Sequence, residues 1–298
     1  MAGKTSFFTE ISRNKRNSIL LVFLVFFILA ALVYVIALAL APGAILIILP
    51  LAGIIIIVHA LTSYYAGDKI VLSTVKAYDP DPTRHIFLIN TVEGLAIAAG
   101  LPTPKIKIMP SKEINAFATG RDPKHATICV TEGALEKLNR QELEGVIAHE
   151  MSHVGNYDIR FFMFVAIFVG LIAIISHIFL RSMMFGGGRS RGGKNDGAIF
   201  LVIGLILAIV APIVVRLVQL SISRKREYLA DATGAKLTRY PEGLASALEK
   251  IGQVNAGKMK ISEAESHMFI ADPKKSFADN LFATHPPIEK RVARLRAM

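Results

Sequence analysis

Four long uncharged and mostly apolar runs constrain the fold of this 298-residue chain more than any other feature. They lie at about residues 17–41, 44–65, 161–180 and 198–215. A helix rises about 1.5 Å per residue, so roughly 20 apolar residues cross a bilayer core of about 30 Å. The sequence therefore predicts a polytopic membrane protein with four apolar helices, in which polar segments separate and follow two helix pairs.

The composition agrees with a membrane location. Hydrophobic residues make up 53% of the chain and charged residues 19%, whereas soluble domains average about 45–50% and about 25%. The formal net charge of +11 is typical of cytoplasmic flanks that contact anionic lipid headgroups. Nucleic-acid binding is the rival interpretation, but no nucleic-acid-binding motif accompanies the charge. We therefore expect a lipid bilayer, and no nucleic acid, as a partner.

The charge distribution predicts how the chain is oriented. Basic residues precede the first run and the turn Pro42-Gly43 carries no charge, which places residues 1–16 in the cytoplasm. A cleaved signal peptide is the alternative, but the first run exceeds a signal core of about 7–15 residues and a second run follows at once. Loops rich in Lys and Arg usually lie in the cytoplasm. The basic, Gly-rich loop at 186–197 would lie on the other side if the last two runs both cross, which opposes this rule. Either the first hairpin overrides the rule or the second pair enters without fully crossing, and both arrangements return the chain to the same side.

The two polar segments show helical and strand patterns, which predict an α+β fold that is mainly α. Residues 66–160 follow the N-terminal hairpin at 1–65, and residues 223–298 follow the second apolar pair at 161–222. The single cysteine, Cys129, excludes a disulfide within the chain, agrees with a reducing compartment and reads as a buried strand residue. Helices are expected at 81–100, 132–138, 241–251 and 288–296, and strands at 105–109, 114–119 and 126–131.

A metal-binding pattern occupies the next expected helix, for which Asn139 is a suitable N-cap. The residues are His149-Glu150-Met151-Ser152-His153. Two histidines four positions apart lie on one face of a helix and can bind one metal ion together, while Glu150 can reach a water on that ion. A chance match on a surface helix is the alternative. Four apolar residues favour a helix with one buried face instead: Leu143, Val146, Ile147 and Val154.

Catalytic zinc usually takes three protein ligands and one water, so a third ligand is needed. The extended pattern H-E-x-x-H-x-x-G-x-x-H is excluded, because Asn156 holds the glycine position and Ile159 the last histidine position. Among distant carboxylates Glu227 is the best candidate. Asp231 lies on the same helical face and could accept a hydrogen bond from a ligand imidazole. The alternative is that Glu227 pairs with nearby basic residues on a solvated face, and spacing alone leaves both readings open.

The reaction also needs a proton carrier, an oxyanion donor and a substrate site. Glu150 would take a proton from the water that zinc acidifies and pass it to the leaving amine. His285, fixed by the two prolines that follow it, is a candidate donor to the tetrahedral intermediate, unless it only starts the last helix. Small residues in an expected strand could let an extended peptide pair beside it, unless the strand is internal: Asn115, Ala116, Phe117 and Ala118.

Taken together, these motifs resemble those of the HtpX heat-shock membrane metalloproteases, relatives of the CAAX prenyl protease Ste24. The resemblance covers nearly the whole chain. It implies one zinc ion per subunit, Glu227 as its third protein ligand, and a gluzincin-type catalytic domain built from two cytoplasmic segments at a bacterial plasma membrane. The matching segments are the N-terminal hairpin, the two central apolar runs, Asn115–Gly120, His149–His153, Glu227–Asp231 and Thr284–Arg291.

The resemblance also implies a zinc metalloendopeptidase of the inner membrane that acts in protein quality control and the heat-shock response. Its substrates would be misfolded or damaged membrane proteins and unfolded polypeptides, with self-cleavage as a further reaction. A transporter or channel subunit is the alternative from another class, but the apolar runs carry few polar groups besides His59 and His177. An inactive scaffold is the third reading, against which the intact residues His149, Glu150, His153 and Glu227 argue.

Overall fold

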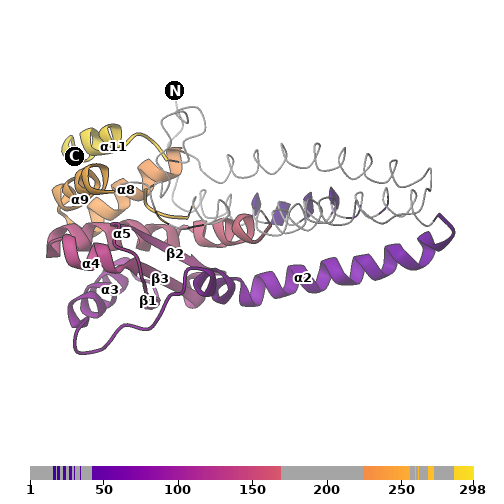
Figure 1. Ribbon diagram of the computed structural model, residues 1–298. Coiled ribbons are helices and arrows are strands. Elements are labelled where there is room, and N and C mark those ends of the chain that lie inside the picture. The colour runs from indigo at the N-terminus through magenta and orange to yellow at the C-terminus, as the bar shows by residue number, and fades with distance from the viewer. Residues whose placement is uncertain are drawn as a thin grey trace, which may run out of the picture.

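The computed structural model describes residues 42–168, 224–255, 259, 261, 268–271 and 285–298, together with scattered residues between 16 and 34. Within these residues the protein is mainly helical and has one three-stranded sheet, which agrees with the expected α+β class. The expected spans at 17–41, 161–180 and 198–215, and the loop at 186–197, lie wholly or largely outside the described residues. One long helix, α2, extends away from the domain that the other labelled elements form (Figure 1).

Helix α2 (Ile45–Thr74) follows a short 3-10 turn, η1 (Pro42–Ala44). Its 30 residues measure about 45 Å, which exceeds the roughly 30 Å of a bilayer core. None of its 18 most apolar consecutive residues is buried in the protein. Among the described residues, α2 is the one helix that is long and apolar enough to cross a membrane. Its exposed side chains include Leu46, Ile47, Ile54 and Ile55, as expected of a surface that faces lipid.

The same helix continues beyond residue 65, where the second span was expected to end. Its last turns bury Val71 and Leu72 in a hydrophobic cluster with side chains of the sheet and of the helical residues 158–168. Gly67 permits a close approach, because a Cβ at this position would lie 2.8 Å from the sulfur of Met163. The lower part of α2 is therefore packed into the domain, although Asp68 and Lys69 end its uncharged run.

The sheet has the order β1-β3-β2. β1 (Lys105–Met109) is parallel to the central strand β3 (Ala126–Thr131), and β2 (Ala116–Gly120) is antiparallel to it. All three expected strands are present, but the second begins at residue 116 rather than 114. The backbone N–H groups of Ile114 and Asn115 donate instead to the side chains of Asn255 and Thr131. Cys129 is buried in β3, and burial raises the pKa of its thiol, which fits a structural residue.

The helices begin and end where local signals place them. α3 (Ile86–Ala99) ends at Gly100, whose φ of 66° provides a left-handed cap. α5 (Arg140–Gly155) begins with a capping box, in which Asn139 and Glu142 each accept from the other's backbone N–H, so the expected N-cap is confirmed. The remaining helices with described ends are α4 (Glu132–Lys137), α8 (Arg224–Thr238), α9 (Pro241–Val254) and α11 (Ile288–Arg296).

Helix α5 crosses the middle of the domain. α8, α9 and α11 lie on one side of it, and the sheet and α3 lie on the other (Figure 1). Two glycines let the covering helices approach closely. A Cβ on Gly145 would lie 2.6 Å from the backbone nitrogen of Leu244 in α9, and a Cβ on Gly234 of α8 would lie 3.0 Å from that of His149. α5 and α8 can therefore bring functional side chains from distant parts of the sequence together.

Candidate metal centre

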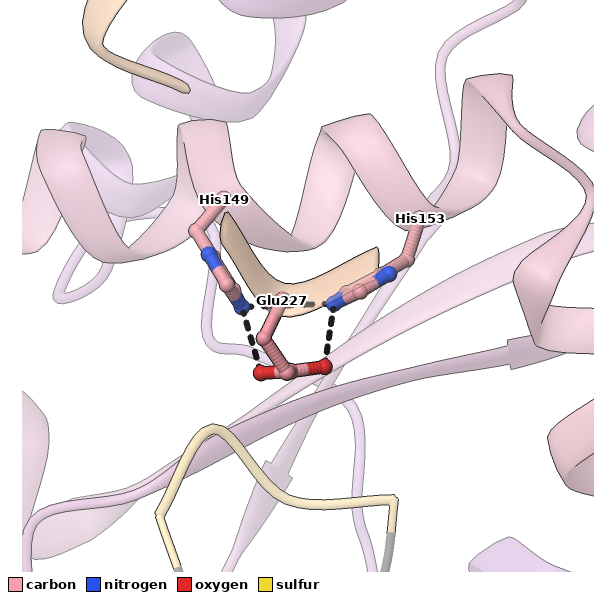
Figure 2. Close-up of side chains that lie close together, drawn as sticks. All are labelled: His149, His153 and Glu227. Carbon is pink, nitrogen blue, oxygen red and sulfur yellow. Dashed lines mark hydrogen bonds and ion pairs between the residues drawn. The ribbon is translucent and has the colours of Figure 1, made fainter. Parts of the chain in front are cut away.

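Three buried side chains converge between α5 and α8. His149 and His153 lie one turn apart on α5, and Glu227 points toward both from the first turn of α8 (Figure 2). Nε2 of His149 lies 3.8 Å from Oε2 of Glu227, and Nε2 of His153 lies 3.6 Å from Oε1. The two Nε2 atoms are 3.2 Å apart. The structure thus brings together the three residues expected to bind the metal, and each is at most 4% exposed.

These donor atoms suit a tetrahedral metal ion. Zinc lies about 2.0–2.2 Å from nitrogen and oxygen ligands, so two ligand atoms of a tetrahedral site are about 3.3–3.6 Å apart. The two Nε2 atoms are 3.2 Å apart, and each lies 3.6–3.8 Å from a different oxygen of Glu227. When one ligand atom is taken from each residue, the three atoms lie within 4.8 Å of one another. Both imidazole rings and the carboxylate also point toward one another (Figure 2). The residues therefore fit a bound cation.

The outer nitrogen of His149 contacts Asp231, which lies four residues after Glu227 on α8. The distance from Nδ1 to Oδ1 is 3.0 Å, so Asp231 occupies the position expected for a carboxylate that orients a ligand histidine. Arg291 of α11 reaches the same carboxylate with two hydrogen bonds, of 2.9 and 2.7 Å. The sequence reading overlooked Arg291, although it closes the motif Thr284–Arg291. Arginines in a basic amphipathic helix usually lie in solvent, yet Arg291 is 0% exposed.

The outer nitrogen of His153 contacts a second carboxylate that sequence reasoning also missed. Asp158 lies five residues later, 0% exposed, with Oδ2 at 2.9 Å from Nδ1 of His153. Arg226, the residue before Glu227, places Nε 3.2 Å from the other oxygen of Asp158. No motif in the sequence pointed to this pair, because an acidic residue before an apolar run also suits a helix end at the membrane surface.

Burial and neighbouring charges set the protonation of the three converging side chains. Burial lowers the pKa of His149 to about 4, although the contact with Asp231 opposes this effect. Burial also disfavours a charge on His153, but the hydrogen bond to Asp158 and the charge of Glu227 outweigh it and raise the pKa of His153 to about 9. For Glu227 burial is outweighed by the charge of His285, which holds its pKa well below the usual range. The site is thus prepared to hold an ionised carboxylate.

Glu150, which directly follows the first histidine, is 1% exposed. Neither of its carboxylate oxygens has a hydrogen bond of good geometry among the described residues. Burial raises the pKa of Glu150 to about 7, although the backbone N–H of Ala118 is near enough to oppose this rise. A buried carboxyl group with this pKa and with unused oxygens has the properties of a general base that acts near neutral pH.

His285 lies at the same site, although its place in the sequence suggested two roles. Its Nδ1 is 3.1 Å from Oε2 of Glu227, while its Nε2 is buried and has no partner in the described part of the chain. Pro287 is the N-cap of α11, so the segment starts the last helix and also delivers His285 to the metal centre. The two readings of this motif are compatible with each other.

Three of the four expected substrate residues lie in β2, Asn115 directly precedes this strand, and all four are buried. A short segment, residues 268–271, covers the outer edge of this strand at its beginning. Ala116 accepts a hydrogen bond from the backbone N–H of Ile270, and the amide of Asn115 donates to the carbonyl of Ala271. Phe117 forms an isolated β-bridge with Phe269, and their rings lie 4.8 Å apart. Of the four residues, only Ala118 has no such contact with this segment among those described.

Comparison with known proteins places the chain in a family. Residues 82–298 match the model of peptidase family M48. A protein named "Protease HtpX homolog" from Caldanaerobacter subterraneus subsp. tengcongensis is 53% identical over 249 residues, which are 83% of this chain and 83% of the relative. A protein of the same name from Dictyoglomus turgidum is 44% identical over 299 residues, covering 98% of this chain and 95% of the relative.

Among solved structures, the crystal structure of S. mikatae Ste24p is similar with a TM-score of 0.49 and 20% sequence identity. The similarity covers 90% of this chain and 62% of the Ste24p chain. The resemblance read from the sequence motifs is confirmed by the family match and by the curated relatives. With a His-His-Glu site at its centre, the chain is a metallopeptidase and belongs to peptidase family M48.

Proposed function

We propose that the protein is a membrane-embedded, zinc-dependent endopeptidase that hydrolyses misfolded or damaged membrane proteins and other unfolded polypeptides. The observation that carries this proposal is the convergence of His149, His153 and Glu227 beside the unpartnered carboxylate of Glu150. A set of two imidazoles and one carboxylate, with an acid group next to them, is the donor set of hydrolytic zinc sites. We assign the three converging residues as the protein ligands of one zinc ion.

When bound, zinc polarises a carbonyl group and makes a coordinated water more acidic. The side chains of the protein supply the remaining chemistry. Glu150 accepts the proton of the attacking water and then donates it to the leaving amine. The contacts of Asp231 with His149 and of Asp158 with His153 hold each ring with Nε2 toward the site. Exclusion of bulk water from this buried centre strengthens each of these interactions.

His285 is proposed to stabilise the negative charge that develops on the substrate oxygen. In a protonated imidazole both ring nitrogens carry a hydrogen. Nδ1 of His285 can then donate to Glu227, while the hydrogen on Nε2 remains for the substrate oxygen. This nitrogen has no competing partner in the described residues. Donors aimed at a developing oxyanion typically contribute about 10²–10³ in kcat. His285 would thus act on the substrate and not on the metal.

The substrate is proposed to bind as an extended strand along β2. Residues 268–271 already occupy the edge at Asn115, Ala116 and Phe117, so pairing is proposed for Ala118 and the residues that follow it. Extended backbone pairing suits unfolded polypeptides, because it uses main-chain groups that every sequence offers. This is the support for a role in quality control and the heat-shock response, and for self-cleavage at an exposed segment of a second copy.

The proposed location is a bacterial inner membrane, crossed by four apolar helices, with the catalytic domain built from two cytoplasmic segments. Support comes from α2, whose apolar surface is unburied, and from the basic N-terminal residues that favour the cytoplasmic side. The lower end of α2 packs directly against the domain through Val71 and Leu72. The catalytic centre would therefore lie close to the membrane surface, where exposed loops of damaged membrane proteins emerge.

The test is a hydrolysis assay on the purified full-length protein in detergent, with casein as an unfolded substrate. We expect cleavage that a chelator abolishes and added zinc restores, and we expect no cleavage by Glu150→Gln. Wild-type protein that holds zinc and leaves casein and unfolded membrane proteins intact would contradict the proposal. That result would favour an inactive scaffold or a transporter subunit.

A further inference from the structure

We propose that Asp158 and Arg226 form a buried ion pair that positions His153, and that metal affinity therefore depends on how the two chain segments flanking residues 169–223 are packed. Asp158 precedes this stretch and begins the helical residues 158–168, which a turn separates from α5, and Arg226 follows the stretch in the first turn of α8. Neither residue is a proposed ligand. The inference rests on the proposed metal site, but it does not require that the site be catalytic.

The first step is the contact that orients the histidine. Nδ1 of His153 lies 2.9 Å from Oδ2 of Asp158, which leaves Nε2 directed toward Glu227. A carboxylate on the outer nitrogen fixes both the tautomer and the orientation of a ligand imidazole. Asp231 makes the equivalent contact with His149. The two histidines are therefore held by carboxylates from different segments of the chain.

The second step is the charge balance of Asp158. A carboxylate that is 0% exposed is strongly disfavoured unless a cation accompanies it. Arg226, which is 7% exposed, provides that cation with Nε at 3.2 Å from Oδ1. One oxygen of Asp158 thus faces His153 and the other faces Arg226. A displacement of Arg226 would remove this cation from beside the buried carboxylate and would change where Asp158 holds the histidine.

The third step is the packing of the arginine and the histidine against the same helix. The guanidinium carbon of Arg226 lies 5.4 Å from the ring centroid of Phe161 and 5.6 Å from that of Phe162. The ring of His153 meets Phe162 edge to face, with centroids 5.5 Å apart. Arg226 and Phe162 therefore determine where Asp158 and His153 can lie. Since Arg226 belongs to α8 and the aromatic residues do not, the position of Nε2 depends on both flanking segments.

The experiment measures the zinc dissociation constant of purified full-length protein by competition with a chelator of known affinity. Loss of an outer carboxylate typically weakens metal binding about 10–100-fold, which is the effect expected for Asp158→Asn. Arg226→Met is expected to weaken binding, and the double variant to bind like Asp158→Asn alone, because the arginine acts through the aspartate. Arg226→Lys, which keeps the charge, should retain more affinity than Arg226→Met.

The matched control is Glu142→Gln, which removes a buried carboxylate from α5 without touching a proposed ligand. Glu142 is 2% exposed and pairs with Lys250 at 2.6 Å. Asp158→Glu is the second test variant, because it keeps the buried charge and should fold, yet it displaces the oxygen that faces His153. We expect it to weaken zinc binding as well, while Glu142→Gln binds zinc like the wild type.

Three results would overturn the proposal. The first is zinc binding by Asp158→Glu and Asp158→Asn within twofold of the wild type. The second is an equal loss of affinity in Glu142→Gln, which would show a general effect of lost stability. The third is a double variant in which the separate losses multiply, which would show that Arg226 acts independently of Asp158. Failure of the wild type to hydrolyse casein would contradict the proposed function and leave this inference standing, since the readout is metal affinity.

Discussion

Arg291 donates two hydrogen bonds to Asp231 across 60 positions of the sequence, from Nε to Oδ2 at 2.9 Å and from Nη2 to Oδ1 at 2.7 Å. Both side chains are buried, and Asp231 in turn contacts His149. A third hydrogen bond joins Arg291 to the carbonyl of Ile270, in the segment that covers β2. The last helix of the chain therefore holds the outer side of the metal centre in place.

Replacing Arg291 by Met should strongly destabilise the protein. The change leaves the carboxylate of Asp231 buried without its cation, and breaking a buried pair in this way typically costs about 3–5 kcal/mol. Denaturant unfolding in detergent measures the change in the free energy of unfolding. Arg296→Met is the control, because Arg296 lies on the same helix as Arg291 but is half-exposed, and its ion pairs with Glu242 and Glu249 of α9 are at the surface. An equal loss in both variants would contradict the special role of Arg291.

Gly234→Ala should weaken both the fold and the metal site. The new Cβ would lie 3.0 Å from the backbone nitrogen of His149, so α8 must shift away from α5, and Glu227 shifts with it. Overpacking of this kind typically costs about 1–3 kcal/mol. Gly94→Ala in α3 is the control: its Cβ meets nothing within 4 Å, and replacing glycine inside a helix should stabilise by roughly 0.5–1 kcal/mol. Thermal unfolding and zinc titration of both variants test this contrast, and unchanged values for Gly234→Ala would refute it.

Hydrolysis should decline as the pH falls through the pKa of Glu150. Only the ionised carboxylate accepts a proton, so kcat/KM should drop about tenfold per pH unit below that pKa. Burial raises the pKa from its ordinary value near 4.5 to about 7, and the charge of a bound metal ion opposes this rise. We therefore expect the acidic limb of the pH profile between these two values. A rate that stays constant down to pH values below 4.5 would exclude Glu150 as the base.

Glu150→Gln should separate metal binding from turnover. The amide has nearly the same shape as the carboxylate but cannot accept the proton, and the three proposed ligands are untouched. Zinc analysis should find the same stoichiometry as in the wild type, while casein hydrolysis should fall to background. A variant that still cleaves casein would show that another group acts as the base.

Local sequence signals were sufficient to predict most elements of the domain. The strand Ala126–Thr131 and the helix Ile288–Arg296 have the expected bounds, and Asn139 caps α5 as its residue type suggests. These features depend on neighbours within a few positions: short apolar runs, capping side chains and prolines before a helix. The end of α2 at Thr74 was missed because Asp68 and Lys69 interrupt the apolar run, whereas burial against another segment lets the helix continue.

The metal centre could be predicted only in part. His149 and His153 share one helix, and their four-residue spacing revealed this pair. Glu227 and Asp231 share another helix, but their spacing left the role of Glu227 open, and the family resemblance identified it as the third ligand. Arg291, Asp158 and the segment 268–271 could not be found in this way, because their roles arise from contacts between distant parts of the chain. A buried arginine on a basic amphipathic helix looks in sequence like a solvated one, and its burial and its hydrogen bonds to Asp231 and Ile270 distinguish it in the structure.

The central claim is that His149, His153 and Glu227 hold one metal ion, and Glu227→Ala tests it most directly. Metal analysis after dialysis should find about one zinc per wild-type chain and almost none in the variant, because two histidines alone bind zinc weakly. Circular dichroism should show that the variant keeps its helices. Glu142→Gln, which alters a buried carboxylate away from the site, should retain its zinc. A folded Glu227→Ala variant that keeps one zinc per chain through dialysis would contradict the account.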